Sequence, residues 1–138
     1  MIITRETDYA LRILRRLGDG QKHTMKTLCE RDAIPQQFAY KIIGKLAKAG
    51  VVQNTRGSSG GCMLSYNLAE LTLFDLLEIM GENYQINACM EKGYQCSWED
   101  NCGEACSIRK KLAGIQSKLD KELAGYSINS LICGESPA

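Results

Sequence analysis

The stretch IPQQFAYKIIGKLAKAGVVQNTRGSSGGCMLSY, residues 34–66, most constrains what this chain can fold into. Pro35 suits a first helical turn, because its fixed φ is already helical and its missing N–H is not needed there. Apolar residues then recur at helical spacing until Gly50, a natural helix stop. These apolar residues are Phe38, Ile42, Ile43, Leu46 and Ala47. Residues 51–55 and 62–66 are strand candidates around a Gly/Ser tip, which predicts a β-hairpin.

Two further helices are expected before this stretch. Residues 5–18 place apolar side chains at i, i+4 and i+7 and end at a glycine, and Thr24 can cap a second helix that runs to about residue 31. Three helices with a short turn before the third, followed by a hairpin, make a winged helix. The predicted fold class is therefore mostly α with a small β-hairpin wing: a winged helix-turn-helix domain followed by a long helix.

The charges of the chain divide unevenly between its two halves. Residues 1–56 hold eleven Lys or Arg against five Asp or Glu, and residues 57–138 hold six against eleven. A basic first half indicates a polyanionic partner, and an acidic second half indicates a separate task. With 138 residues, the chain is one domain or one domain with a dimerising extension.

The polar side of the helix after Pro35 is the predicted DNA-reading surface. In a winged helix this third helix enters the major groove, while the wing reaches the minor groove or the phosphates. The expected partner is double-stranded promoter DNA, contacted from the helix by Gln36, Gln37, Tyr40, Lys41 and Lys45 and from the wing by Arg56, Gly57 and Ser58. The alternative for any one of these residues is an ordinary solvated surface, but basic excess, helix order and hairpin together favour DNA binding.

Two helices are predicted in the second half, at residues 72–81 and from about residue 104 onward. Ile108, Leu112, Ile115 and Leu119 follow 4-3-4 spacing, the narrow apolar seam of a helix that packs on a twin. A homodimer would also supply the two half-sites that winged-helix regulators read. The expected organisation is a DNA-binding domain at 1–81, a cysteine-rich loop at 82–106, and a dimerisation helix with a C-terminal tail at 107–138.

The loop between these helices holds four of the seven cysteines: Cys89, Cys96, Cys102 and Cys106. Structural zinc sites favour closer Cys-x2–4-Cys pairs, and only the last two of these cysteines are that close. A redox-sensing thiol needs a positive field, which nearby basic residues could supply. An iron–sulfur cluster accepts soft thiolates at irregular spacing. Spacing alone leaves zinc and a cluster about equally favoured.

The chain resembles the Rrf-two (BadM-type) family of winged-helix transcriptional regulators. The similarity runs from TDYALRILRRL through IPQQFAYKIIGKLAKAGVVQNTRGSSGGCMLS and LTLFDLLEIM to CSIRKKLAGIQSKLDKELAGYSINSL, nearly the whole chain. Its most specific marks are the RG-x-x-GG wing and the cysteine loop ahead of the long helix. Members of the family include iron–sulfur regulators, a nitric-oxide sensor and a repressor of cysteine metabolism.

The resemblance implies an iron–sulfur cluster, 2Fe-2S or 4Fe-4S, held by three cysteines of the loop. On the family pattern Cys89 and Cys106 are ligands, with Cys96, Cys102 or both between them. The fourth ligand varies in the family, and Asp8 matches an acidic ligand that the partner subunit contributes. The implied function is a dimeric regulator whose promoter binding is controlled by a labile cluster that senses cluster supply, nitric oxide or redox state.

Other classes of protein stay open at this point. A cluster-free thiol-redox or zinc-containing regulator would share the fold, and a small iron–sulfur redox carrier or scaffold would use the cysteines but not the basic wing. An enzyme is not expected, because the chain has one histidine, His23, and no paired carboxylates or nucleophile motif. Lacking a signal peptide or a membrane-spanning run, it is expected to be cytoplasmic, with no membrane partner. Cys29, Cys62 and Cys133 are interpreted as small apolar residues.

Overall fold

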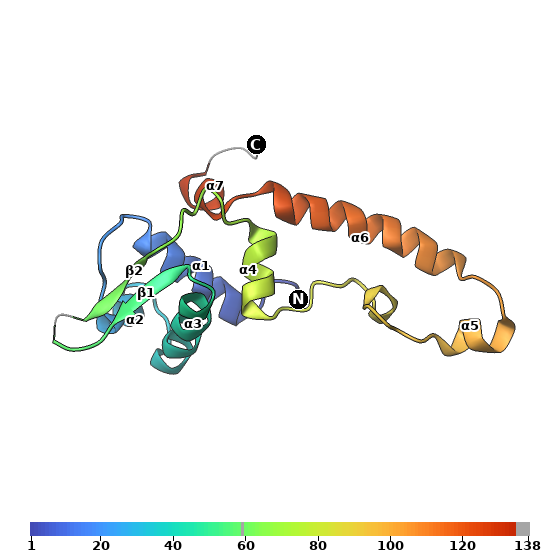
Figure 1. The fold of residues 1–138 in the computed structure, drawn as a ribbon, viewed down its shortest axis with the longest axis horizontal. Helices are drawn as coiled ribbons and strands as arrows, with labels where there is room; N and C mark the ends of the chain where they lie inside the picture. The colour runs from blue at the N-terminus through green and yellow to red at the C-terminus, as the bar shows by residue number, and fades with distance from the viewer. Residues whose placement is uncertain (59, 135–138) are drawn as a thin grey trace.

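The computed structural model describes residues 1–58 and 60–134, which form a helical body and a long arm (Figure 1). The elements in chain order are α1 (Arg5–Leu17), α2 (Met25–Arg31), α3 (Gln36–Lys48), β1 (Val52–Thr55), β2 (Gly61–Leu64), α4 (Leu73–Met80), the 3₁₀ turn η1 (Ala88–Met90), α5 (Ser97–Cys102), α6 (Ser107–Gly125) and α7 (Ile128–Cys133). The body contains α1 to α4, the hairpin and α7, whereas α6 and residues 82–106 extend from it. A mostly helical chain with one antiparallel hairpin confirms the predicted fold class.

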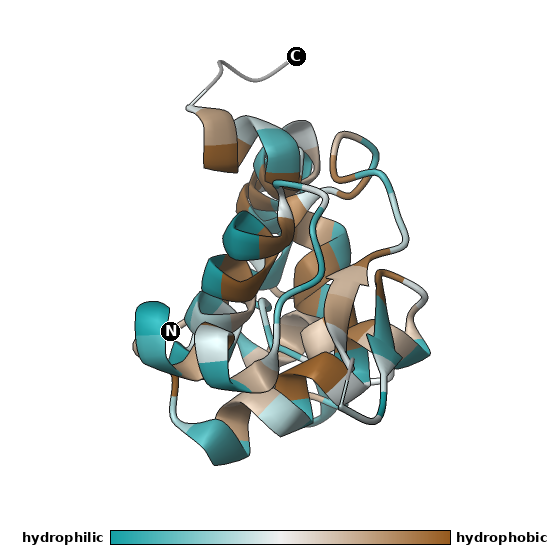
Figure 2. Cartoon of the chain, turned by 90° about the vertical axis from the view of Figure 1, so that its left-hand side faces the viewer, coloured by the Kyte–Doolittle hydropathy of each residue, from teal (hydrophilic) through white to brown (hydrophobic). Residues whose placement is uncertain are grey.

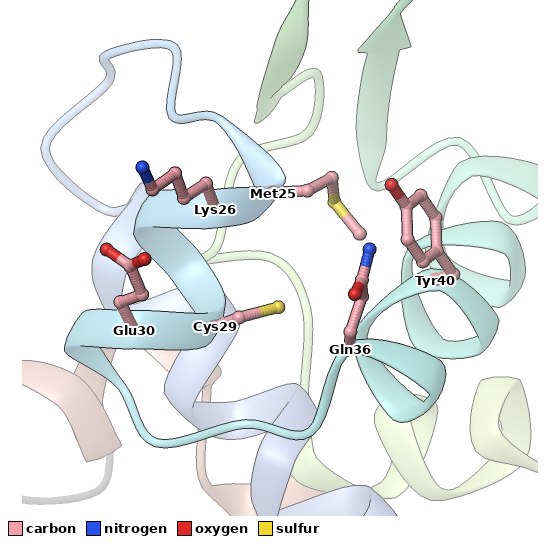
Figure 3. A pocket seen from close by; sticks show the side chains of 6 residues that line it. All are labelled: Met25, Lys26, Cys29, Glu30, Gln36 and Tyr40. Atoms are coloured by element: carbon pink, nitrogen blue, oxygen red, sulfur yellow. The ribbon is translucent and has the colours of Figure 1, made fainter.

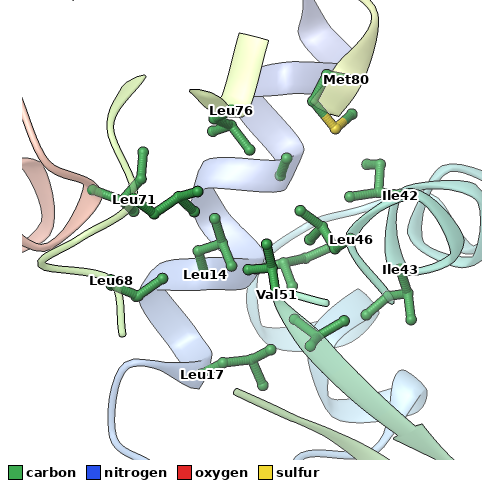
Figure 4. Packing of buried hydrophobic residues seen from close by; sticks show 14 of the residues in the cluster. Leu14, Leu17, Ile42, Ile43, Leu46, Val51, Leu68, Leu71, Leu76 and Met80 are labelled. Atoms are coloured by element: carbon green, nitrogen blue, oxygen red, sulfur yellow. The ribbon is translucent and has the colours of Figure 1, made fainter. Parts of the chain in front are cut away.

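Helix α1 lies in the middle of the body, where it contacts α3, α4, β2 and α7. Its apolar side chains Ile13, Leu14 and Leu17 are fully buried, and Figure 4 shows Leu14 with Leu46 on one side and Leu71 on the other. Burying each such side chain contributes about 1.5–3 kcal/mol. Seen from the end of the body, the helices carry hydrophobic and hydrophilic residues along their lengths, as amphipathic helices do (Figure 2).

Helix α3 begins one residue later than predicted. Pro35 is its N-cap, with an extended ψ of 136°, so its missing N–H falls just before the helix, where it is equally harmless. Ala39, which the predicted apolar stripe omitted, is fully buried. Phe38 is only half-buried, and it packs on Tyr9 of α1 with ring centroids 5.5 Å apart. Gly50 follows the helix with φ +78°, a left-handed conformation that suits glycine.

The wing is an antiparallel hairpin in which β1 pairs with β2 along its whole length. Its second strand begins one residue earlier and ends two residues earlier than predicted. The wing is tied to the body because His23 N–H donates to the Cys62 carbonyl (2.9 Å) and Cys62 N–H donates to that of His23 (2.8 Å). At the tip, a Cβ on Gly60 would lie 2.4 Å from the Thr55 carbonyl oxygen, so a larger residue would force the turn apart.

Helix α4 has the predicted capping box. Asp75 N–H donates to Thr72 Oγ1 (3.1 Å), and Thr72 N–H donates to Asp75 Oδ2 (2.9 Å). The predicted buried face is also confirmed. Its members are Leu73, Leu76, Leu77 and Met80.

Helix α7 was not predicted, and it returns the chain to the body after α6. Ile128 is fully buried, and its N–H donates to the Leu71 carbonyl at 2.7 Å, while Leu73 N–H donates to that of Tyr126 at 2.9 Å. The segment that follows α6 is therefore packed against the start of α4. No helix within the described residues is long and apolar enough to cross a membrane.

Candidate nucleic-acid interface and cysteine site

The outer face of α3 presents four of the five predicted DNA-reading side chains to solvent. They are Gln36, Gln37, Tyr40 and Lys41. Tyr40 is 55% exposed although its side chain is large and aromatic. On the wing, Arg56, Gly57 and Ser58 are exposed as well. The structure therefore leaves these seven predicted contacts accessible to a partner.

A hollow of about 570 Å³ lies where α3, the start of α2 and the wing meet. Tyr40 lines it from α3, Thr24 and Met25 line it from α2, and Arg56 and Gly57 line it from the wing. The hollow thus joins Tyr40, one of the predicted helix residues, to the predicted wing residues in one concave surface. Polar and cationic groups gathered around such a concavity suit a phosphate backbone.

A second hollow, of about 360 Å³, lies between α2 and α3 (Figure 3). The thioether of Met25 and the thiol of Cys29 point from α2 toward Gln36 and Tyr40 of α3. The sequence analysis did not include Thr24 and Met25 in the predicted DNA-reading surface. The signal that could have found them is the geometry of the helix-turn-helix, in which the two consecutive helices pack together at the DNA surface.

Lys45 does not share the outer face of α3. Its Nζ donates to Glu6 Oε1 (2.9 Å) and to the Met80 carbonyl oxygen (3.0 Å), and only 32% of its side chain is exposed. Lys41, one turn earlier, donates to Glu6 Oε2 at 3.2 Å. Hydrogen bonding to Lys45 above all, and the charge of both lysines, hold the pKa of the Glu6 carboxyl below its usual value. Lys45 therefore links α3 to α1 and to the C-terminus of α4, where a cation also complements the helix dipole.

The arm begins with a carboxylate that binds α1. Gly81 caps α4 with φ +72°, and the Glu82 carboxylate then accepts hydrogen bonds from the hydroxyls of Thr4 and Thr7. Thr4 is the N-cap of α1 and Thr7 is fully buried, so a negative charge lies at the positive end of that helix. No local pattern predicted this contact, because its partners are more than seventy residues apart.

Farther along, the arm is bound to α6 by the buried side chain of Gln116. Gln116 Oε1 accepts from Ile86 N–H (2.8 Å), and its Nε2 donates to the Tyr84 carbonyl (3.3 Å) and to Asp120 Oδ1 (2.8 Å). Tyr84 in turn donates its hydroxyl hydrogen bond to Glu78 of α4. This bond and partial burial raise the pKa of Tyr84 to about 12. These polar contacts, together with the ring of Tyr84 packed on Phe74 of α4 (centroids 5.0 Å apart), position the arm between α4 and α6.

Three of the four loop cysteines line one hollow of about 390 Å³ beside the N-terminus of α6. They are Cys89, Cys96 and Cys106, and Trp98 and Arg109 share the hollow with them. Cys102 lies outside it, exposed at the end of α5, with its Sγ accepting from Glu104 N–H at 3.4 Å. Across residues 1–58 and 60–134, no three Cys, His, Asp or Glu side chains already stand at metal-ligand spacing. The hollow therefore gathers soft donors without bringing them into contact.

Cys106 is the N-cap of α6, and Glu99 holds it in place. Arg109 N–H donates to Cys106 Sγ (3.4 Å), and Cys106 N–H donates to Glu99 Oε1 (3.1 Å). Glu99 Oε2 also pairs with Arg109 Nη1 at 3.4 Å. Arg109 is thus engaged at the edge of the thiol hollow by a carboxylate of α5.

Asp8 lies in the first turn of α1, apart from the thiol hollow of its own chain. Its Oδ2 pairs with Arg12 at 2.9 Å and with Arg5 at 3.8 Å, and its side chain is 41% exposed.

The single histidine, His23, lies before α2, and its Nε2 is 2.8 Å from Asp19 Oδ2.

The remaining cysteines differ from one another in exposure. Cys62 is fully buried, and burial raises the pKa of its thiol to about 11. Burial also raises the pKa of Cys29. Both environments suit a small apolar residue, whereas Cys133 is exposed at the end of α7.

A helix-turn-helix unit with a hairpin wing, followed by an arm that carries thiols, defines a winged-helix protein. The chain belongs to the Rrf2 family, described as iron-dependent transcriptional regulators, which it matches over residues 3–134. This confirms the family resemblance and makes the chain a DNA-binding transcriptional regulator.

Individual relatives match along most of the chain. The chain is 30% identical over 135 residues to protein aau3 of Rhizobium meliloti (strain 1021), across 96% of this chain and 85% of that one. It is 27% identical over 124 residues to the HTH-type transcriptional regulator NsrR of Geobacillus kaustophilus (strain HTA426), across 87% and 84%. Its fold is similar to those of CymR, the global cysteine regulator of B. subtilis (TM-score 0.75, 17% identity, 99% of both chains), and T. potens IscR (TM-score 0.68, 16% identity, 97% and 88%). These two structures show the shared fold alone.

Proposed function

We propose that this regulator is a homodimer whose promoter binding is controlled by an iron–sulfur cluster held by Cys89, Cys96 and Cys106. One observation carries the proposal: these three thiols, from separate parts of the arm, line a single hollow, and Cys102 lies outside it. The donors are soft thiols, which suit an iron–sulfur core and not a hard cation that prefers oxygen. The description of the family as iron-dependent supports the same assignment.

A cluster-free thiol switch is the second candidate. It is favoured by the likeness in fold to CymR, described as a cysteine regulator. A four-cysteine zinc site fits less well, because it would need Cys102, whose thiol is engaged by Glu104 away from the hollow. A redox carrier or scaffold would have no use for the exposed polar face of α3 and the wing beside it.

The ligands would connect two parts of the arm. When bound, a cluster supplies a redox-sensitive link between its ligands. Cys89 lies in η1, and Cys106 caps α6, so ligation by both would fix the arm against the start of that helix. Asp8 of the partner subunit is the proposed fourth ligand. It would have to leave its ion pair with Arg12 to serve.

The arm reaches the DNA-reading helix through polar contacts with α1. Glu82, on the way from α4 to the thiol hollow, binds the hydroxyls of Thr4 and Thr7. Glu6 of the same helical turn binds Lys41 and Lys45 of α3. A shift of the arm would therefore act on the start of α1 and, through it, on α3. Couplings of this kind are usually about 1–3 kcal/mol, or 5–150-fold in affinity.

We expect serine at Cys89, Cys96 or Cys106 to abolish most of the bound iron and sulfide, because each change removes one of the three thiols of the hollow. Cys102→Ser should retain both, and Cys133→Ser is the control for loss of an exposed thiol. The measurement is the visible spectrum with iron and acid-labile sulfide per chain, on protein purified without oxygen. One zinc ion per chain without sulfide would show that the site binds zinc and not an iron–sulfur cluster. Equal loss in Cys102→Ser would instead indicate a four-cysteine set.

Cluster-loaded and apo protein should differ in affinity for a promoter duplex by about 5–150-fold, because ligation fixes the arm that contacts α1. Anaerobic titration of one labelled fragment with both forms measures the ratio. Cys102→Ser, loaded and apo, is the matched control and should show the same ratio. Equal affinity of the two forms on every fragment tried would leave the thiol site without a regulatory role.

The exposed face of α3 is proposed to read bases, and the wing is proposed to hold the DNA backbone. Gln37→Ala should cost about 1–3 kcal/mol of binding and relax the preference at one base pair, because an amide that reads a base edge is lost. Arg56→Ala should weaken all duplexes alike and reduce the salt dependence by about one phosphate contact. Fluorescence anisotropy on a promoter and a scrambled duplex gives both quantities. Lys121→Ala, on the exposed side of α6, is the charge control; if Arg56→Ala binds no more weakly than this control, the wing contact is wrong.

The apolar stripe of α6 is proposed as the homodimer seam. Ile108 is 68% exposed and Ile115 is 54% exposed in the single chain, so both are available to a second copy. Ile115→Glu should give a folded monomer in sedimentation velocity, because a charge there would be buried only in the dimer. Leu119 packs against the core of the same chain, which makes it a less selective site for this test. Lys118→Glu is the control on the same helix, and an unchanged dimer in Ile115→Glu would exclude this seam.

A further inference from the structure

One carboxylate serves two lysines of α3, and the two lysines differ in how firmly they are held. Lys45 binds Glu6 at 2.9 Å and has a second acceptor, the Met80 carbonyl, at 3.0 Å. Lys41 binds Glu6 at 3.2 Å, and within the described residues this is its one acceptor. The Lys41 side chain is 60% exposed, against 32% for Lys45. Lys45 is therefore the fixed partner of Glu6, and Lys41 is the partner that can leave.

Glu6 itself is poorly placed to follow Lys41. Its side chain is 19% exposed, and its Oε1 stays bonded to Lys45. The backbone around it is held by Thr4 and Thr7, whose hydroxyls both bind Glu82. An ammonium group that moved outward to a phosphate would leave this carboxylate behind, with Oε2 unpaired and Oε1 still bonded to Lys45.

We infer that Glu6 competes with DNA phosphate for the ammonium group of Lys41, and that it thereby lowers the affinity of the regulator for every duplex. The inference rests on the proposed DNA-facing role of α3. Binding requires the Lys41–Glu6 pair to open, which leaves Lys45 to neutralise the carboxylate without Lys41. Since an exposed ion pair is weak, the effect should be about two- to fivefold in affinity. The overall strength of DNA binding is thus set by a residue of α1 that need not touch DNA.

The test is a set of four proteins: the parent, Glu6→Gln, Lys41→Ala and the double variant. Each is titrated with one promoter duplex and one scrambled duplex over a range of salt. Glu6→Gln should bind both duplexes about two- to fivefold more tightly, with a salt dependence that steepens toward one further phosphate contact. The double variant should bind no more tightly than Lys41→Ala. Glu30→Gln, which removes a carboxylate from the edge of the α2–α3 hollow, is the control, and its effect should not depend on Lys41.

A gain from Glu6→Gln that persists without Lys41 would overturn the inference, because Glu6 would then act through the general field alone. Unchanged or weaker binding by a Glu6→Gln protein with an unaltered melting temperature would overturn it as well. The glutamine keeps an oxygen for Lys45, so the variant should fold. Should it melt early, nitrogen NMR of Lys41 Nζ and Lys45 Nζ in the parent decides: the Lys41 signal should shift when the promoter duplex is added, and the Lys45 signal should not. An unchanged Lys41 signal in the DNA complex would refute the competition.

Failure of the proposed DNA face gives a different result. If Lys41→Ala binds every duplex as tightly as the parent, α3 does not present Lys41 to DNA, and both proposals fall. If Lys41→Ala binds more weakly while Glu6→Gln leaves binding unchanged, the DNA face stands and the competition alone is wrong.

Discussion

The hydrogen bonds at the N-terminus of α1 are the constraint on which the arrangement of the two halves depends. Thr7 is fully buried there, and a buried hydroxyl without an acceptor would cost about 1–3 kcal/mol. Glu82 supplies that acceptor from the first residue of the arm after the α4 cap. Glu6, in the same turn, binds Lys41 and Lys45 of α3. Among the described residues no buried side-chain nitrogen or oxygen lacks a partner, so these bonds satisfy the polar groups while they fix three segments together.

Much of the body could be predicted because its elements are marked by short-range signals. Threonine caps, a left-handed glycine after α3 and apolar residues at helical spacing lie within a few positions of what they determine. Helix α7 carries signals of the same kind, the cap Ser127 and the left-handed Gly134, but they enclose a helix of only six residues. Ile128 is buried because Leu71, more than fifty residues earlier, offers both a carbonyl acceptor and an apolar neighbour. The short elements of the arm, η1 and α5, were likewise missed, since few apolar residues mark their faces.

The candidate sites were predictable to the same extent. The phase of the buried stripe of α3 determines which side chains point outward, and it identified Gln36, Gln37, Tyr40 and Lys41 correctly as exposed. It could not show that Lys45 is hydrogen-bonded within the chain, because its acceptors, Glu6 and the Met80 carbonyl, are 39 and 35 residues away in the sequence. Spacing alone also treats the four loop cysteines as equals. The fold separates them, because α5 ends at Cys102 and leaves that thiol outside the hollow.

The body and the arm are held by contacts of different kinds, which decides where a regulatory signal can act. Each buried leucine of the body contributes about 1.5–3 kcal/mol, and α1, α3 and α4 share many of them, so a small free energy cannot shift these helices apart. The described part of the arm beyond Tyr84 is positioned by a few hydrogen bonds, chiefly those of Gln116, each with a net value of about 0.5–1.5 kcal/mol. A coupling of about 1–3 kcal/mol equals one to three such bonds. On the proposed mechanism, a free energy of that size is therefore enough to move the arm and too small to deform the core. It can reach α3 through the polar contacts at the start of α1 and through the Lys45–Met80 hydrogen bond.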